Sequence, residues 1–383
     1  MRARVVQLSG LDPGELGRWQ ELADRAIEPN AFLDPRFLEP SSRLRDDARD
    51  TRLLFVEDGD ELLGVMAFAV VPRKIRGLPV RAVTPRIPVL SEESERWYPL
   101  IDPDRASETL EALLLGFSRL DLPGYLDLDC FPADGALNDA LFAAAASADV
   151  PIVERGSEEF AFLYPGPTAG TAADLSSLIA LDALSTHSRK NFARLLRGLE
   201  RELGGAPSLT DRGEDPSSIE DFLALQAAGW KGDSASGGGF AYRVSGQEPW
   251  FREVTSRFRA AGRLSVHSLV YEQTTLYMAV TYRSGGREFG VQDAYDERFA
   301  RFRTGTLGRL AVMQRFLSQP DAAQFDPDLN PRYADSTHIY PHRRRFSSYL
   351  LATGGALPRS VVSALPVLRQ VRDALTREGR QRA

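Results

Sequence analysis

The stretch FGVQDAYDERFARFRTGTLGRLAVMQRFL (residues 289–317) decides the fold of the second half of the chain. Residues 289–293 have the pattern of a strand, and residues 306–317 have helical periodicity. Between them, Thr304-Gly305-Thr306 opens the helix. Free backbone N–H groups at a helix start, together with the positive end of the helix dipole, bind phosphate oxygens well. The stretch therefore predicts a strand, a turn and a helix whose first residues can hold a phosphate.

Residues around this turn are candidates for binding a phosphate-bearing cofactor. Gly305 would let a diphosphate approach the backbone closely, because it has no side chain. Arginines before it offer charge-assisted contacts. The candidate cofactor-binding residues are Arg301, Arg303, Thr304, Gly305 and Thr306. An ordinary loop and helix cap is the alternative interpretation of the same residues.

Working outward, the neighbouring elements predict a mixed sheet flanked by helices. Three apolar runs joined by hairpin-like turns predict an antiparallel meander over residues 264–271, 275–283 and 287–293. A short strand is expected at 323–325, after the helix. Upstream helices are expected at 187–203, 217–228 and 248–261.

The first half has a similar order of elements. Asp12 and Pro13 predict a helix start, with the helix running to residue 27. Glu57-Asp58-Gly59-Asp60 separates two apolar runs, 52–56 and 61–71, and predicts a hairpin. The further expected elements are strands at 5–8, 125–131 and 152–164 and helices at 107–120 and 135–148. The dipeptide Met66-Ala67 matches Met278-Ala279 in its place within the hairpin, which supports two copies of one α/β unit.

The clearest linker is Pro165-Gly166-Pro167-Thr168-Ala169-Gly170. It predicts an N-terminal domain over residues 1–165 and a second domain over 166–355. The remaining tail, 356–383, has apolar residues at helical spacing with arginines between them, which predicts an amphipathic helix that docks on the protein or on an anionic membrane surface.

Composition limits the possible functions. The 383 residues allow two to three domains, and a net charge of −6 weakens the case for nucleic acid. Cys130 is the only cysteine, so neither an intramolecular disulfide nor a thiolate metal cluster is possible. There is no metal-ligand spacing, P-loop, dinucleotide fingerprint or nucleophile elbow. No apolar run is long enough to cross a membrane and the N-terminus has no apolar leader, so a cytoplasmic protein without a metal or a tightly bound cofactor is expected.

Several short motifs occur in an order that resembles the CelD/BcsL-like branch of the GNAT acyltransferase superfamily. They include Gly229-Trp230-Lys231-Gly232, Tyr295-Asp296-Glu297, and Asp326 followed by Arg343-Arg344-Arg345. Two departures stand out: Arg303-Thr304-Gly305 replaces the family's Ser-Pro-Gly turn, and Tyr340 stands where the family has a Trp. The resemblance covers most of the second half. It implies an α/β (α+β) fold of two tandem GNAT-like domains, each with a mixed, largely antiparallel sheet flanked by helices.

The resemblance also implies roles for individual residues. Tyr295 would protonate the departing thiolate, and Asp296 would accept a proton from the attacking amine. Asp326, at a strand end, is a third catalytic candidate. Candidates for substrate binding are Trp230, Lys231, Arg189 and Lys190. Each has a structural alternative: aromatic packing for Tyr295, a cap for Asp296, a helix-end anchor for Trp230 and a solvated helix face for Arg189 and Lys190.

The function that these features predict is acyl transfer from a thioester, with acyl-coenzyme A as co-substrate, to an amine or hydroxyl of a sugar, peptide or small metabolite. The resemblance links this activity to polysaccharide or cell-envelope biosynthesis. Two alternatives stay open. One is a Fem-type transferase that uses aminoacyl-tRNA, which the basic helix at Arg189 to Arg201 favours and the net charge disfavours. The other is a degenerate GNAT scaffold without catalysis.

Overall fold

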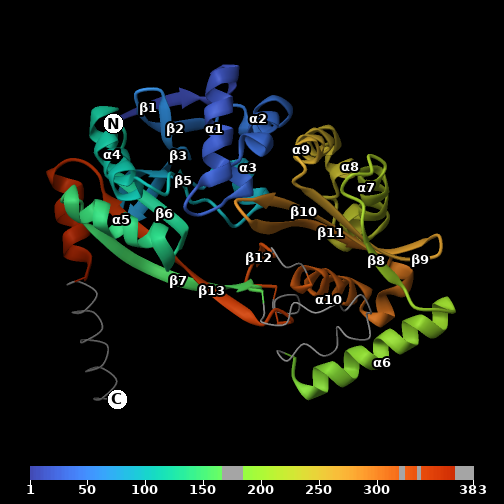
Figure 1. The fold of residues 1–383 in the computed structure, drawn as a ribbon. Coiled ribbons are helices and arrows are strands. Elements are labelled where there is room, and N and C mark those ends of the chain that lie inside the picture. Colours follow the sequence, from blue (N-terminus) through green and yellow to red (C-terminus); the bar gives the residue numbers. More distant parts are fainter. Residues whose placement is uncertain (166–183, 319–323, 334–337, 367–383) are drawn as a thin grey trace, which may run out of the picture. The chain divides into compact units, whose positions relative to one another are not determined.

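The structure is a computed structural model that describes residues 1–165, 184–318, 324–333 and 338–366 (Figure 1). The chain divides into two compact units. Unit 1 comprises Met1–Pro35, Asp47–Glu158 and Arg345–Ala383, and unit 2 comprises Arg36–Asp46 and Glu159–Arg344. The chain passes between the units at four points, after Pro35, Asp46, Glu158 and Arg344.

Unit 1 is built on a mostly antiparallel sheet. Its strand order is β1-β2-β3-β4-β6-β13-β7, and β5 pairs with β3. The strands are β1 (Arg2–Gln7), β2 (Arg52–Asp58), β3 (Glu61–Ile75), β4 (Leu78–Thr84), β5 (Leu100–Ile101), β6 (Tyr125–Pro132), β7 (Ile152–Phe162) and β13 (His342–Ala352). β13, from the end of the chain, thus lies between two strands of the first half.

The helices of unit 1 largely follow the local sequence signals. They are α1 (Pro13–Arg25), α3 (Pro88–Glu93), α4 (Ala106–Arg119) and α5 (Gly135–Ser147). The predicted start of α1 is confirmed, because Asp12 accepts the N–H of Glu15 and the Glu15 side chain accepts the N–H of Asp12. The predicted hairpin is also confirmed: Asp58 pairs with Glu61 around a turn in which Gly59 has a φ of 60°.

Unit 2 has a second sheet with the order β12-β11-β10-β9-β8. Its strands are β8 (Ser208–Asp211), β9 (Leu264–Tyr271), β10 (Thr274–Ser284), β11 (Arg287–Tyr295) and β12 (Gln324–Asp326). Its helices are α2 (Pro35–Leu44), α6 (Thr186–Leu203), α7 (Ser218–Ala228), α8 (Tyr242–Ser245), α9 (Glu248–Ala260) and α10 (Thr304–Leu317). In Figure 1, α7 to α9 cover one face of this sheet and α10 covers the other.

The two sheets share a connection pattern. In unit 1, β2, β3 and β4 are antiparallel neighbours and β4 then pairs with β6 in parallel. In unit 2, β9, β10 and β11 repeat this arrangement and β11 pairs with β12 in parallel. The prediction of an α/β fold with two similar halves, each a mixed and largely antiparallel sheet with helices, is confirmed.

Some predictions about elements were wrong. β3 does not stop at Pro72 but continues to Ile75, pairing with β4, which the sequence analysis did not predict. β13, which was not predicted, begins at His342, and the Nδ1 atom of this residue accepts the N–H of Tyr164 at 3.1 Å. In the predicted tail, residues 356–366 are helical, and the rest lies outside the described residues. None of the described helices has the length and apolar character needed to cross a membrane.

Candidate active site at the open edge of β11

The edge of β11 that faces β12 is paired over only part of its length. β12 meets β11 at Arg287, Glu288 and Phe289 and goes no further. Beyond them Val291 is an extra residue, because Gly290 pairs with Thr281 and Gln292 with Val280 of β10. Such a bulge bends a strand and ends regular pairing. Within the described residues, the last part of β11 therefore has a strand partner on the β10 side alone.

The backbone of this segment presents hydrogen-bonding groups to the open edge. The Asp296 N–H donates to the Leu276 carbonyl at 2.9 Å, so this pair is bonded across to β10. Antiparallel pairs alternate between bonded and non-bonded. The pairs Tyr277–Tyr295 and Ala279–Asp293 are the non-bonded ones. The N–H and C=O groups of Asp293 and Tyr295 consequently point away from β10, toward the open edge.

Lys231 closes part of this edge. It lies in the short 3-10 helix η5 (Trp230–Gly232), and its Nζ donates to the Asp293 carbonyl at 2.6 Å and to Gln292 Oε1 at 3.1 Å. Its Nζ also lies 3.5 Å from Asp293 Oδ1. Burial lowers the pKa of Lys231, and the Asp293 carboxylate opposes this shift. Lys231, proposed from sequence to bind substrate, thus binds the strand itself.

Asp293 is the centre of a half-buried polar cluster. Its Oδ2 accepts from Arg309 Nε at 2.7 Å and from the Tyr277 hydroxyl at 3.3 Å. Burial alone would raise the pKa of Asp293, but Arg309 and Lys231 outweigh burial and hold this pKa well below its usual range. Tyr340 belongs to the same region: burial raises the pKa of its hydroxyl, with Arg309, Asp293 and Asp326 close enough to act on it.

Sequence reasoning missed Arg309, Tyr277 and the role of Asp293. Their residue types could have indicated the cluster. A carboxylate, an arginine and a tyrosine occur within apolar elements, where a charged group needs a partner. The pairing of β10 with β11 and the packing of α10 then bring together groups that are far apart in sequence.

Two glycines of α10 determine how closely the helix approaches the sheet. A Cβ on Gly305 would lie 2.9 Å from Cδ1 of Tyr295, and a Cβ on Gly308 would overlap the ring of Tyr277. The two tyrosines are direct partners across β10 and β11, and the glycines are three apart on one helix face. The bare Cα of Gly305 therefore accommodates Tyr295, whereas the sequence analysis assigned that space to a diphosphate.

The backbone of the turn before α10 nevertheless retains donors. Arg303 has a left-handed φ of 54°, and its carbonyl accepts the N–H groups of Thr306 and Leu307. The Thr304 hydroxyl donates to the Phe299 carbonyl at 2.7 Å. Across the described residues, the N–H groups of Thr304 and Gly305 have no acceptor.

The two candidate arginines of this turn differ in their partners. Arg301 pairs with Glu202 at 2.6 Å. The Arg303 guanidinium lies 5.9 Å from the ring centre of Phe192. Cation–π contacts of exposed groups are weak, so Arg303 is the more available cation for an anionic ligand.

Asp296 serves as a cap. It precedes the 3-10 helix η7 (Glu297–Phe302), accepts the N–H of Arg298 at 3.0 Å and pairs with the Arg298 guanidinium. Burial acts to raise the pKa of Asp296, but the hydrogen bonds and charge of Arg298 lower it overall. The geometry thus shows the capping role, and the lowered pKa makes Asp296 a weaker base than a free carboxylate.

Tyr295 and Trp230 both interact with Glu297. Burial, then Glu297 and Asp293, raise the pKa of the Tyr295 hydroxyl, so it stays protonated at neutral pH. The Trp230 N–H donates to Glu297 Oε1 at 2.5 Å. The Trp230 ring, 40% exposed, meets Phe240 edge-on at 5.2 Å.

The remaining candidates lie on other elements of unit 2. Asp326 ends β12, is fully buried and accepts the N–H of Asp328 at 2.9 Å. Arg189 and Lys190 lie in the first turns of α6, where Arg189 is half-buried and Lys190 exposed.

Comparison with known proteins agrees with this architecture. Residues 186–326 match a family model described as "Acetyltransferase (GNAT) domain". The chain is similar in structure to FemX, at 10% identity and a TM-score of 0.54, covering 91% of this chain and 97% of that one. It is also similar to a conserved protein of unknown function from Bacteroides thetaiotaomicron VPI-5482, at 11% identity and a TM-score of 0.52, covering 88% and 96%. No curated protein matches by sequence. At such identities these likenesses show a shared fold alone, and the match to a GNAT domain holds for residues 186–326.

Proposed function

We propose that this protein transfers an acyl group from a thioester, with acyl-coenzyme A as donor, to an amine or hydroxyl at the open edge of β11. The observation that carries the proposal is the outward direction of the Asp293 and Tyr295 N–H groups, on a bulged strand inside the segment that matches the GNAT domain. A thioester is already activated, so positioning and carbonyl polarisation supply much of the acceleration.

In the proposed reaction, the Asp293 N–H, the Tyr295 hydroxyl and Asp296 each take part in one step. The thioester carbonyl oxygen accepts a hydrogen bond from the Asp293 N–H, which stabilises the oxyanion formed when the acceptor attacks. The C–S bond then breaks as the C–N or C–O bond is completed. The Tyr295 hydroxyl gives its proton to the leaving sulfur. Asp296 remains the proposed acceptor of the amine proton, with its basicity reduced by Arg298.

The start of α10 is the proposed anchor for the donor. The N–H groups of Thr304 and Gly305, at the positive end of a 14-residue helix, would hold diphosphate oxygens. Arg303 would add a charge-assisted contact. The side of Gly305 that Tyr295 covers is excluded, so the diphosphate has to approach along the helix axis.

Arg303→Gly tests this anchor without straining the fold. Glycine adopts a φ of 54° more readily than arginine, so the variant keeps or improves stability while it loses the cation. Isothermal titration with coenzyme A should show a Kd raised about tenfold. Glu272→Gly is the matched control, since Glu272 has a φ of 51° in the β9–β10 turn. Equal affinity in both variants would remove the turn as the donor site.

A second candidate is the Fem-type reaction with aminoacyl-tRNA. The likeness to FemX shows a shared fold, and α6 has four exposed cations: Lys190, Arg194, Arg197 and Arg201. Binding to tRNA should then weaken steeply as salt rises. Absence of binding at low salt removes this candidate, and absence of binding to both tRNA and coenzyme A favours a scaffold. With acyl transfer from acyl-coenzyme A we also propose a CelD/BcsL-like role in cell-envelope or polysaccharide synthesis and a cytoplasmic location.

A further inference from the structure

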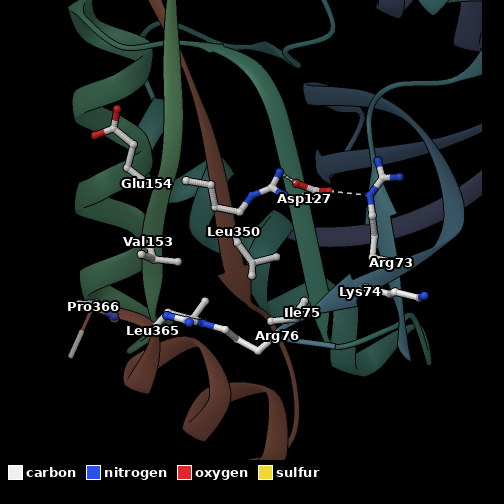
Figure 2. Close-up of a pocket in the computed structure, with 11 residues that line it drawn as sticks. Arg73, Lys74, Ile75, Arg76, Asp127, Val153, Glu154, Leu350, Leu365 and Pro366 are labelled. Atoms are coloured by element: carbon white, nitrogen blue, oxygen red, sulfur yellow. Dashed lines mark hydrogen bonds and ion pairs between the residues drawn. The ribbon is translucent and has the colours of Figure 1, made fainter. Parts of the chain in front are cut away.

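Unit 1 contains a cavity of about 330 Å³ that is separate from the elements of the candidate active site (Figure 2). Its apolar wall is formed by Ile75, Val153, Leu350 and Leu365, which come from β3, β7, β13 and the helical residues 356–366. The volume lies at the lower end of the range of small-molecule sites, about 300–1,000 Å³. The cavity is large enough for a small ligand with an apolar part.

Most of the rest of the cavity lining is charged. Asp127, almost fully buried, pairs with Arg73 at 2.8 Å and with Arg155, which also contacts Asp129 at 2.9 Å. These two arginines are therefore neutralised by two aspartates. Lys74 and Arg76 also line the cavity, and they have no ion-pair partner among the residues that the structure describes. Glu154 also lines the cavity but pairs with Arg345, so the positive charge of Lys74 and Arg76 is left over.

Arg76 has an unfavourable backbone conformation. It forms, with Gly77, the two-residue turn between β3 and β4, where Ile75 pairs with Leu78. The φ values are 52° at Arg76 and 83° at Gly77, as a type I′ turn requires. Asn, Asp and Gly are the residues that favour such a position, and arginine there is strained. Figure 2 shows the Arg76 side chain running from this turn across the cavity toward Leu365.

We propose that this cavity binds a small amphipathic anion, with its carboxylate or phosphate head on Arg76 and its apolar tail over Ile75, Val153, Leu350 and Leu365. The strain at Arg76 motivates the proposal, and its position in the cavity lining distinguishes it from the other strained residues, such as Glu272. A lone phosphate would leave the apolar wall uncovered, and a lone hydrocarbon would leave the Arg76 guanidinium without an anion. The proposal does not depend on the reaction assigned to unit 2.

The test uses the full-length protein and two probes, octanoate and octyl phosphate, titrated calorimetrically at low salt. The variant is Arg76→Asn, which removes the cation and suits the turn better, so its melting temperature should equal or exceed that of the parent. The Kd of at least one probe should rise about tenfold in the variant. Arg119→Asn, an exposed arginine at the end of α4 that does not line the cavity, should leave Kd unchanged.

A second variant examines the apolar wall. Leu365→Glu places a carboxylate beside the tail and within the region that Arg76 reaches, so both probes should lose binding while unfolding stays cooperative. Octanol lacks the anionic head and acetate lacks the apolar tail, so both should bind much more weakly than octanoate. The proposal is overturned if neither probe binds, if octanol binds as tightly as octanoate, or if Arg76→Asn binds both probes like the parent.

Discussion

Tyr295 has two roles that one substitution separates. Its ring packs on Gly305, and its hydroxyl, with a raised pKa, is the proposed proton donor. Tyr295→Phe keeps the ring and removes the proton. We expect thiol release from acetyl-coenzyme A in the presence of an amine acceptor to slow by about 10²-fold, the lower range for general acids, with donor affinity unchanged. Equal turnover in the variant and the parent would exclude the hydroxyl from the reaction.

Lys231 and Lys190 were both predicted to bind substrate, and the structure gives them different surroundings. Lys231 bonds Asp293 and Gln292 and is half-buried, while Lys190 is exposed on α6. Lys231→Met should lower the free energy of unfolding by about 1–3 kcal/mol, because it removes one charged partner from a half-buried carboxylate that keeps Arg309 and Tyr277. Lys190→Met should change it by less than ~0.5 kcal/mol. Urea denaturation measures both, and equal small effects would show that Lys231 does not stabilise β11.

At the scale of elements, the packing of α10 on β10 and β11 depends on Gly308. Alanine is the better helix former by about 1 kcal/mol, yet its methyl would overlap the Tyr277 ring. Gly308→Ala should therefore destabilise the protein by about 1–3 kcal/mol, the usual cost of overpacking.

Gly17→Ala in α1 is the matched control for Gly308→Ala. A Cβ at this exposed position would meet nothing within 4 Å, so the same substitution should stabilise by about 1 kcal/mol. Chemical denaturation of the two variants gives the comparison. Stabilisation by both would mean that α10 does not sit closely on Tyr277.

Local signals predicted many elements but not the long-range pairing between them. Asp12 with Pro13, and Gly59 in its turn, act on neighbouring residues, so the start of α1 and the β2–β3 hairpin could be predicted. β13 was not predicted, since its position between β6 and β7 depends on strands about 200 residues earlier. Nor was α2 predicted; it packs in unit 2, where Ser41 accepts from the Trp250 indole at 2.9 Å.

The candidate site could be predicted in part. The sequence indicates a strand, a turn and a helix with a glycine, and these exist as β11, η7 and α10. It could not show that Tyr295 fills the space beside Gly305, since this contact depends on the angle at which α10 crosses the sheet. The cluster around Asp293 joins residues from four elements, and such a cluster has no short motif.

For the whole molecule, buried carboxylates predict sensitivity to acid. Interactions in the native state hold the pKa values of Asp293, Glu288 and Asp211 below their ordinary values. The unfolded chain, with carboxyl pKa values near ~4, therefore binds more protons than the native state below about pH 5, and stability falls as pH falls. Burial raises the pKa of Asp127, so this residue makes the native state more stable as pH falls. It opposes the three carboxylates whose pKa values are lowered.

The free energy of unfolding should thus drop by at least ~1.4 kcal/mol between pH 6 and pH 3, the equivalent of one pKa unit for one group. Urea unfolding at intervals across this range measures the drop, and Glu288→Gln should make it shallower. A constant free energy of unfolding down to pH 3 would contradict the ion pairing described for unit 2.

The central claim is that the open edge of β11 receives the reactive carbonyl of a thioester, and a crystal structure with acetyl-coenzyme A bound tests it most directly. We predict the carbonyl oxygen within about 2.7–3.2 Å of the Asp293 nitrogen, and the diphosphate at the N–H groups of Thr304 and Gly305. A donor bound elsewhere, or an edge of β11 filled by the protein's own chain, would contradict the account.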